Sequence, residues 1–451
     1  SAQLDQNSIA SSRELLNRFV SFYSNASYTY DDKYVLSGSI RWDRSNLWGT
    51  NSKYQNKPLW SVGGSWNIYK EKFFQADFVD MLKLRASYGI GGNIGRNTAP
   101  YLIASYYDSS LVDGMAGSVN TPPNKDIRWE KTTTVNVGVD FALFRHRLSG
   151  TIEYYNKYSV DLLAAINGSP TQGFGYTTLM TNNGKMVNRG VEITLSGEII
   201  RQKDFSWNAS LLYAFNRNKV KHISVQPSLW DSRISMPTSY PMVGKPLYGI
   251  YAYKWAGLNE NGDPQVYDAE NNVTSGPARD YHALVYCGTT VPIHNASLTN
   301  VLRYKGFEFS AMLILDAGHK LRSSNIPSIN MSNGRITSTA KGIVDRWTQP
   351  GDVTDVPRLL FSNDTENFNT HRTELYRYSD LFVYDASNIR LSNISLAYRV
   401  PAHWCKKISL SGARLQFNVE NVATFAFDSK ANYDLGGKVK PNYVWGLYLN
   451  F

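Results

Sequence analysis

The chain has 451 residues, of which 13% are aromatic and only 19% are charged, and its net charge is +10. This composition excludes intrinsic disorder, because disordered chains lack aromatic residues. No apolar run approaches the roughly 18 residues of a membrane-spanning helix. The basic residues are spread singly, which argues against a nucleic-acid partner. A large soluble β protein or a transmembrane β-barrel remains.

Apolar and polar residues alternate with a period of two, which predicts β-strands. The alternation is clearest in residues 134–143 and 205–215. The thirteen strands predicted in chain order are 17–30, 34–48, 59–71, 82–92, 131–144, 146–161, 186–201, 204–219, 294–305, 307–319, 383–400, 407–423 and 442–451. Many exceed the roughly 5–6 residues usual in soluble proteins. They are long enough to cross a bilayer, which takes about 9–11 tilted residues.

Short and long connections alternate along the predicted strands. Short turns are expected at 31–33, 75–81, 145, 202–203, 306 and 401–406, and long loops at 49–58, 93–130, 162–185, 220–293, 320–382 and 424–441. Outer-membrane barrels alternate short periplasmic turns with long extracellular loops in this way. We therefore expect an all-β, antiparallel transmembrane barrel with extracellular loops at about 93–130, 220–293 and 320–382.

The direction of the chain follows from its last strand. Barrel chains normally finish at the periplasmic side, so thirteen strands place the start of the first strand, and residues 1–16, outside the cell. Bacterial single-chain barrels have even strand numbers. We therefore expect residues 1–451 to form the C-terminal part of one barrel.

Several short runs resemble those of SusC/RagA-like TonB-linked outer-membrane transporters. The set comprises 28–36 (YTYDDKYVL), 82–89 (LKLRASYG), 128–134 (RWEKTTT), 182–192 (NNGKMVNRGVE), 345–347 (DRW) and 389–396 (IRLSNISL), in the order of the family. The resemblance implies a barrel of 22 strands, filled by an N-terminal plug and covered by a SusD-like surface lipoprotein. About 13 of those strands would lie in this chain, and no plug domain is recognised in it.

The resemblance also implies partners and a function. The expected partners are the N-terminal part of the same transporter as a separate chain, the SusD-like lid, TonB acting through the plug, and membrane lipid or lipopolysaccharide. A dimer of transporter–lid pairs is compatible with the family. The implied function is active import of an oligosaccharide or an oligopeptide across the outer membrane. The sequence contains no converging catalytic constellation, no HExxH motif and no metal-spaced cysteine pair, so we expect no catalysis, cofactor or metal. The alternatives are a siderophore or cobalamin receptor, and a soluble β-rich carbohydrate-binding or adhesion protein.

Two sets of aromatic residues are candidates for specific roles. Tyr248, Tyr251, Tyr253 and Trp255 lie in a predicted long loop, where they would stack on cargo, pack within the loop or contact the lipoprotein lid. Tyr28, Tyr30, Tyr34, Trp207 and Phe451 lie near short turns, as interfacial girdle residues do. Tyr443, Trp445, Leu447, Leu449 and Phe451 alternate along the last strand and resemble the signal read by the barrel-insertion machinery.

Two further features have simple expectations. Cys287 and Cys405 are predicted on opposite sides of the membrane and therefore unbonded, because a disulfide needs Cα atoms within about 7 Å. The run 259–264 (NENGDP) is interpreted as a polar turn at a loop tip, with a calcium loop as the alternative.

Overall fold

The computed structural model describes residues 18–46, 51, 54, 57–93, 95, 100–109, 114–168, 171, 178–227, 232–276, 280–327, 329–332, 335–359, 370–436 and 440–451. Among these residues, no helix is long and apolar enough to cross a membrane.

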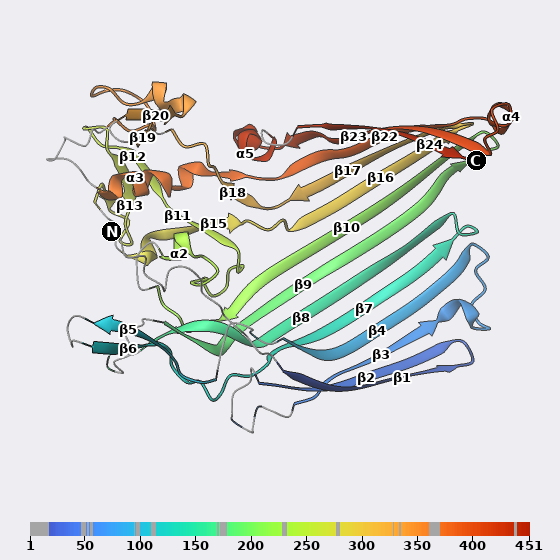
Figure 1. The fold of residues 1–451 in the computed structure, drawn as a ribbon, viewed down its shortest axis with the longest axis horizontal. Coiled ribbons are helices and arrows are strands. Elements are labelled where there is room, and N and C mark those ends of the chain that lie inside the picture. Colours follow the sequence, from blue (N-terminus) through green and yellow to red (C-terminus); the bar gives the residue numbers. More distant parts are fainter. Residues whose placement is uncertain are drawn as a thin grey trace, which may run out of the picture.

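One antiparallel sheet dominates the molecule (Figure 1). Its thirteen strands are β1 (Phe19–Tyr30), β2 (Tyr34–Ser45), β3 (Leu59–Asn67), β4 (Val79–Asn93), β7 (Glu130–Leu143), β8 (Leu148–Asn167), β9 (Thr178–Arg201), β10 (Phe205–His222), β16 (His294–Tyr304), β17 (Phe307–Ala317), β22 (Asn388–Arg399), β23 (Gly412–Ala426) and β24 (Asn442–Asn450). Each strand pairs with the next one in this order. The thirteen predicted strands are therefore confirmed.

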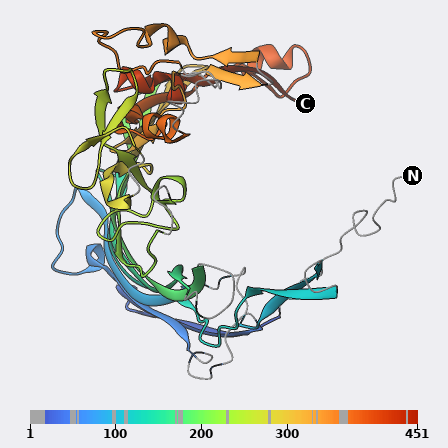
Figure 2. The same cartoon turned by 90° about the vertical axis from the view of Figure 1, so that its left-hand side faces the viewer.

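The sheet is open. In Figure 2 it curves through an arc that runs from the N-terminal strands to the C-terminal ones. Strands β1 and β24 form its two edges and do not pair with each other in the described structure. The arc has the curvature of a barrel wall, but its edges lie apart.

The register separates an apolar face from a polar face, because directly opposed residues of paired strands share one side of a sheet. One row across twelve strands contains only apolar and aromatic residues: Tyr30, Tyr34, Trp66, Leu84, Val139, Ile152, Ile193, Tyr213, Ala296, Leu315, Ile389 and Phe425. The adjacent row, offset by one residue in every strand, is mostly polar. It contains Ser65, Arg85, Gly138, Glu153, Glu192, Ala214, Asn295, Asp316 and Asn388. We call these sides the apolar face and the polar face.

All short turns lie at one end of the sheet, the right-hand end in Figure 1. The hairpin between β1 and β2 turns through Asp31 and Asp32, which adopt positive φ angles of 50° and 53°. Two consecutive positive φ angles give a turn whose twist matches the flanking strands, and aspartate tolerates them. This short-turn end also carries α4 (Ala402–Lys406).

The opposite end carries the long loops, which are themselves folded. They contain β5 (Ile103–Ser109), β6 (Gly114–Thr121), β11 (Gly249–Tyr253), β12 (Trp255–Leu258), β13 (Pro264–Tyr267), β14 (Val273–Thr274), β15 (Leu284–Thr289), β18 (Lys320–Arg322), β19 (Ile329–Ser332), β20 (Arg335–Thr339), β21 (Val383–Asp385), α2 (Ser232–Ser235), α3 (Thr370–Arg377) and α5 (Asn432–Gly436). We call this the long-loop end.

Several predicted boundaries were wrong, and the largest errors have local reasons. The strand predicted at 383–400 begins at Asn388, because β21 leaves the sheet to pair with β18. The strand predicted at 407–423 begins at Gly412, because α4 and Ser409, with φ 59°, extend the turn. The loop predicted at 162–185 is largely a continuation of β8 and β9, whose register shifts beside Asp161.

Candidate functional site

The polar face carries a network of charged residues on β4, β7 and β8. Arg85 places its Nε atom 3.1 Å from Asp140 and binds both oxygens of Glu153 at 3.1 and 3.2 Å. Asn136 donates to Glu153 at 2.7 Å, and Thr151 donates to Asp140 at 3.0 Å. A bidentate guanidinium–carboxylate pair fixes geometry as well as charge. The network therefore joins three strands across a polar wall.

Replacing Arg85 with methionine should destabilise this wall by about 2 kcal/mol, the usual worth of hydrogen bonds to charged groups. The change would leave Asp140 and Glu153 as two neighbouring carboxylates that lack their shared cation. Thermal unfolding in detergent measures the loss. Arg201→Met is the control, because Arg201 pairs with Glu198 from a side chain that is 76% exposed. Equal midpoints for both variants would contradict the role of the network.

Motifs from two parts of the sequence meet at the long-loop end of this wall. Arg128 lies 2.8 Å from Asp161, and its guanidinium stands 4.6 Å from the ring centre of Tyr54. Asn182 accepts from the Arg128 amide at 3.0 Å and donates to the Arg128 and Asp161 carbonyls. These contacts hold together the ends of β7, β8 and β9. They show a structural role for Arg128 of the 128–134 motif and for Asn182 of the 182–192 motif.

A folded body, which we call the loop unit, consists of the described parts of residues 232–293 and 320–387. Its core contains Tyr251, Tyr253, Val266, Ala283, Leu284 and Leu375, all buried. Leu375 comes from α3, more than a hundred residues after β11 and β13. Two long loops that are distant in sequence therefore share one hydrophobic core.

Buried polar contacts hold the two halves of the loop unit together. Arg322 donates to the carbonyls of Tyr251, Ser379 and Arg377 at 2.6, 3.2 and 3.3 Å. Burial lowers the pKa of this guanidinium. Trp255 donates its amide to Asp380 and its indole N–H to Asp355, both at 2.9 Å.

Asp263 forms a second link between the halves. Its carboxylate lies 2.6 Å from Arg372 and 3.3 Å from Arg358, and all three side chains are about four-fifths buried or more. Its neighbour Gly262 has φ 73° and lies directly against the ring of Trp347. A side chain at position 262 would collide with that ring, so the glycine permits close approach of the two loops.

The structure separates the four aromatic candidates of the long loop. Tyr251 and Tyr253 are 1% and 0% exposed, so their rings pack in the core of the loop unit and are not available for stacking on cargo. For Tyr251 and Tyr253, the alternative prediction of packing within the loop is therefore the correct one. Tyr248 is 51% exposed, and Trp255 is half-buried beside Tyr376. Only Tyr248 and Trp255 stay candidates for contact with cargo.

A cavity of about 330 Å³ lies on the polar face at the long-loop end. Its walls come from the ends of β8, β9 and β10 and from residues 238–247: they include Leu162, Leu163, Met180, Met186, Val220 and Pro241, with Glu130, Lys185 and His222 as polar groups. A mainly apolar cavity with a few polar groups is typical of a ligand subsite. Sequence reasoning missed it, because its walls meet only after folding.

Residues 259–264 form a polar turn between β12 and β13. The Asn259 side-chain oxygen accepts hydrogen bonds from the amides of Asn261 and Asp263, both at 2.9 Å. This oxygen therefore stabilises the backbone of the turn. Within the described ranges, no group of three His, Cys, Asp or Glu side chains is placed to hold a metal ion.

Both cysteines are free, as expected. Burial raises the pKa of the Cys287 thiol, in β15, to about 11. The ordinary thiol pKa is about 8.5, so at neutral pH Cys287 should contain far less of the reactive thiolate than an exposed cysteine does.

Alkylation of Cys287 by iodoacetamide should therefore keep rising about tenfold per pH unit between pH 8 and 10. The Cys405→Ser variant isolates this thiol, and mass spectrometry measures the rate. The same chain unfolded in denaturant is the control and should level off near pH 9. A native profile that also levels off there would contradict the raised pKa.

Aromatic residues gather at the short-turn end of the apolar face. Tyr28, Tyr30, Tyr34 and Phe451 have exposed rings. Trp207 is half-buried and donates to Asn300 at 3.1 Å. The alternating residues of β24 are exposed as well: Tyr443, Trp445, Leu447 and Leu449. An extended exposed apolar face is unusual for a soluble protein and marks a surface that something else covers.

Comparisons with known proteins agree with this architecture. The family model described as "TonB dependent receptor-like, beta-barrel" matches residues 3–422. TonB-dependent receptor P3 of Formosa agariphila is 27% identical over 95% of this chain and 43% of its own length. TonB-dependent receptor SusC of Bacteroides thetaiotaomicron is 25% identical over 90% of this chain and 40% of its own length.

Solved structures show the same fold. The RagAB peptide transporter is 24% identical, with a TM-score of 0.76 over 96% of this chain and 48% of that chain. This chain spans less than half the length of the curated relatives it matches. The predicted SusC/RagA-like resemblance and barrel fold are confirmed, and the soluble alternative is set aside. Because the family model covers nearly the whole sequence, this chain belongs to the β-barrel family of TonB-dependent receptors, which are proteins of the bacterial outer membrane.

Proposed function

We propose that this chain forms wall and loops of a transporter that imports a large nutrient by a TonB-dependent mechanism. The family match is the observation that carries the proposal. In such barrels apolar residues face lipid and polar residues face the lumen. The apolar face is therefore assigned to the bilayer, the polar face with Arg85 to the lumen, and the long-loop end to the cell exterior.

The open edges of the sheet support a proposal about assembly. Unpaired backbone groups cost several kcal/mol each in lipid, so only closed barrels are stable there. We propose that strands from the N-terminal part of the transporter, as a separate chain, pair with β1 and β24. The resemblance implies about nine such strands, together with a plug through which TonB acts.

The proposed cargo is an oligosaccharide or an oligopeptide, bound between the loop unit and a SusD-like lipoprotein lid. One structural neighbour is described as a peptide transporter, and one relative is named SusC. The apolar cavity near Met180 and Val220, with Tyr248 and Trp255 of the loop unit, would contact the cargo. A dimer of transporter–lid pairs is proposed on the resemblance alone.

Growth and binding assays test the import proposal. A deletion strain should lose growth on one glycan or peptide source and regain it with the wild-type gene, with the lid and the cargo co-purifying in native mass spectrometry. The proposed role is not catalytic, so released cargo should be chemically unchanged. Loss of growth only under iron or cobalamin limitation would instead support the siderophore or cobalamin alternative.

We also propose that the face formed by Tyr443, Trp445, Leu447, Leu449 and Phe451 is read during barrel insertion. Phe451 is 92% exposed in this chain, so its ring packs little against the thirteen strands described above. Phe451→Ala should lower the amount of assembled protein in the membrane several-fold, while Phe427→Ala, another exposed phenylalanine, should not. Equal amounts of both variants would refute the signal.

A further inference from the structure

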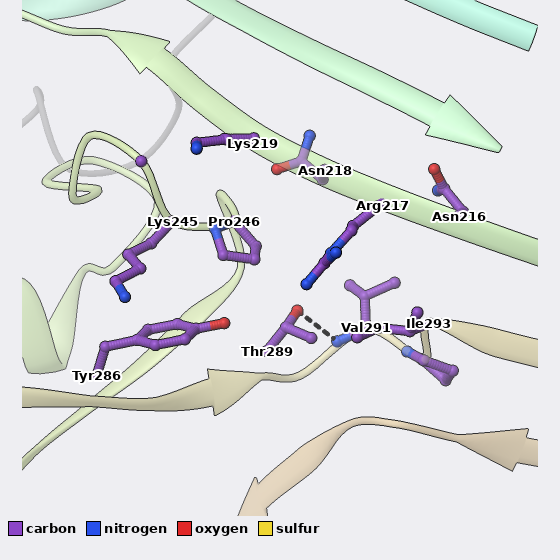
Figure 3. A pocket seen from close by; sticks show the side chains of 12 residues that line it. Asn216, Arg217, Asn218, Lys219, Lys245, Pro246, Tyr286, Thr289, Val291 and Ile293 are labelled. Carbon is purple, nitrogen blue, oxygen red and sulfur yellow. Dashed lines mark hydrogen bonds between the residues drawn. The ribbon is translucent and has the colours of Figure 1, made fainter.

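A cavity of about 410 Å³ lies where β10 continues beyond the end of β16 (Figure 3). The last paired position is Phe215 with His294, and the segment 286–293 then diverges from β10. Residues 244–246 close the remaining side and are held against β10 by two hydrogen bonds. The Gly244 amide donates to the Val220 carbonyl at 2.8 Å, and the Val220 amide donates to the Lys245 carbonyl at 2.9 Å. The cavity is thus framed by three backbone segments.

Three cations line this cavity, and no acidic residue does. Arg217 and Lys219 come from β10, and Lys245 comes from the segment 244–246, which hydrogen-bonds to β10 at Val220. The Lys245 ammonium group stands 4.8 Å from the ring centre of Tyr286, which also lines the cavity. Among the described residues, none of these cations forms an ion pair. Such a site attracts an anion that can satisfy several donors at once, as a phosphate group does.

The strand register shows on which face of the sheet Arg217 and Lys219 lie, and how far along β10. Phe205, Tyr213, Phe215, Arg217 and Lys219 are separated by even numbers of residues along β10, so all lie on the apolar face. The β10–β16 register is regular throughout its length.

The distance from Phe205 to Phe215 corresponds to roughly 25 Å of membrane height for a strand tilted by about 40°, close to the height of a lipid-facing apolar band. Phe205 lies beside the short turn, and Phe215 packs against His294 with ring centres 5.3 Å apart. Arg217 and Lys219 therefore lie just above the band, on the exterior side, at the level of lipid headgroups.

The rim of the cavity has a matching apolar part. Pro246, Val291, Pro292 and Ile293 line it beside the cations, and Val291 is 43% exposed. A site that combines uncompensated cations with apolar walls at headgroup level suits a phosphorylated lipid better than a soluble anion.

We propose that this cavity binds the phosphate group of a lipid headgroup in the outer leaflet. Arg217 and Lys245 both bind the phosphate, Lys219 adds charge, and the apolar rim contacts the sugar or acyl part of the lipid. The proposal rests on the outer-membrane location and on the orientation of the apolar face. It does not depend on which cargo is imported.

The test compares lipid retained by the purified transporter complex after detergent exchange. The Arg217→Gln/Lys245→Gln variant should retain at least tenfold less phosphorylated lipid A than wild type in native mass spectrometry. Lys406→Gln/Lys407→Gln removes the same charge from exposed side chains at the short-turn end and should retain the wild-type amount. The Arg217→Lys/Lys245→Arg variant keeps both charges and should retain most of the lipid, which separates lost charge from misfolding.

Two probes distinguish the possible sources of the phosphate. Lipid A added back should bind, whereas enzymatically dephosphorylated lipid A should not. Inorganic phosphate at millimolar concentration should compete only weakly; equal affinity would overturn the lipid source and assign the site to free phosphate. Unchanged lipid retention in the Arg217→Gln/Lys245→Gln variant, or equal binding of dephosphorylated lipid, would refute the proposal.

Discussion

Replacement of Asp263 by asparagine is expected to loosen the loop unit while the barrel wall stays folded. The carboxylate lies between Arg372 and Arg358, whose side chains are only 12% and 21% exposed. Removing one partner from a largely buried ion pair costs about 3 kcal/mol or more, because the remaining charges lose their compensation. Here two guanidinium groups would be left together, so their mutual repulsion adds to the loss.

Limited proteolysis of the folded protein in detergent measures this effect. The Asp263→Asn variant should be cut much faster than wild type within residues 232–293 and 320–387. Amide hydrogen exchange should accelerate at Tyr253 and Val266, which lie in the shared core. The thermal midpoint of the sheet should change little, since strand pairing holds the sheet and the Asp263 cluster lies within the loop unit.

Glu260→Gln is the matched control for this prediction. Glu260 lies in the same turn and loses the same charge, but its side chain is exposed. Its cleavage rate should equal that of wild type. If both variants are as resistant as wild type, the Asp263 cluster does not hold the two loops together, and the hydrophobic core around Leu375 must suffice.

The sequence was enough to predict the wall. In a strand that faces lipid on one side and a polar lumen on the other, apolar and polar residues must alternate. The sequence of residues 205–215 is therefore enough to identify them as such a strand. Strand order required no long-range information either, because each strand pairs with its neighbour along the chain. Errors occurred where the pattern continued through a change of partner, as at Val383–Asp385, which alternates like a strand but pairs with β18.

The loops were much less predictable, because their contacts join distant segments. In the sequence, Tyr251 and Tyr253 are typical of an exposed binding loop. In the structure they are buried in a core that includes Leu375 of α3, a segment more than a hundred residues away. The side chains of Arg322 and Asp263 form their hydrogen bonds with residues that lie 55 to 109 positions away in the sequence. The two cavities have the same origin, since no short motif contains both of their walls.

Assembly of the wall itself should fail when Gly190 is replaced by valine. Gly190 lies on β9 between Tyr155 of β8 and Asn216 of β10. A Cβ atom at this position would overlap the Tyr155 ring and would stand 2.5 Å from the Phe215 carbonyl oxygen. One obstacle is backbone in a paired strand, so a side-chain rotation cannot relieve it. The Tyr155 ring instead covers the glycine and fills the space that a side chain would take.

The expected result is loss of the folded, heat-modifiable band on gels of outer-membrane extracts for Gly190→Val. Gly190→Ala should show a partial loss, because overpacking by a single methyl group typically costs 1–3 kcal/mol. Gly38→Ala is the matched control in β2, where the nearest atom to a new Cβ would be 3.7 Å away, an ordinary contact. A Tyr155→Ala/Gly190→Ala double variant should recover little, since the Phe215 carbonyl remains. Normal assembly of Gly190→Val would mean that β9 can move relative to β8 and β10, contrary to the register described above.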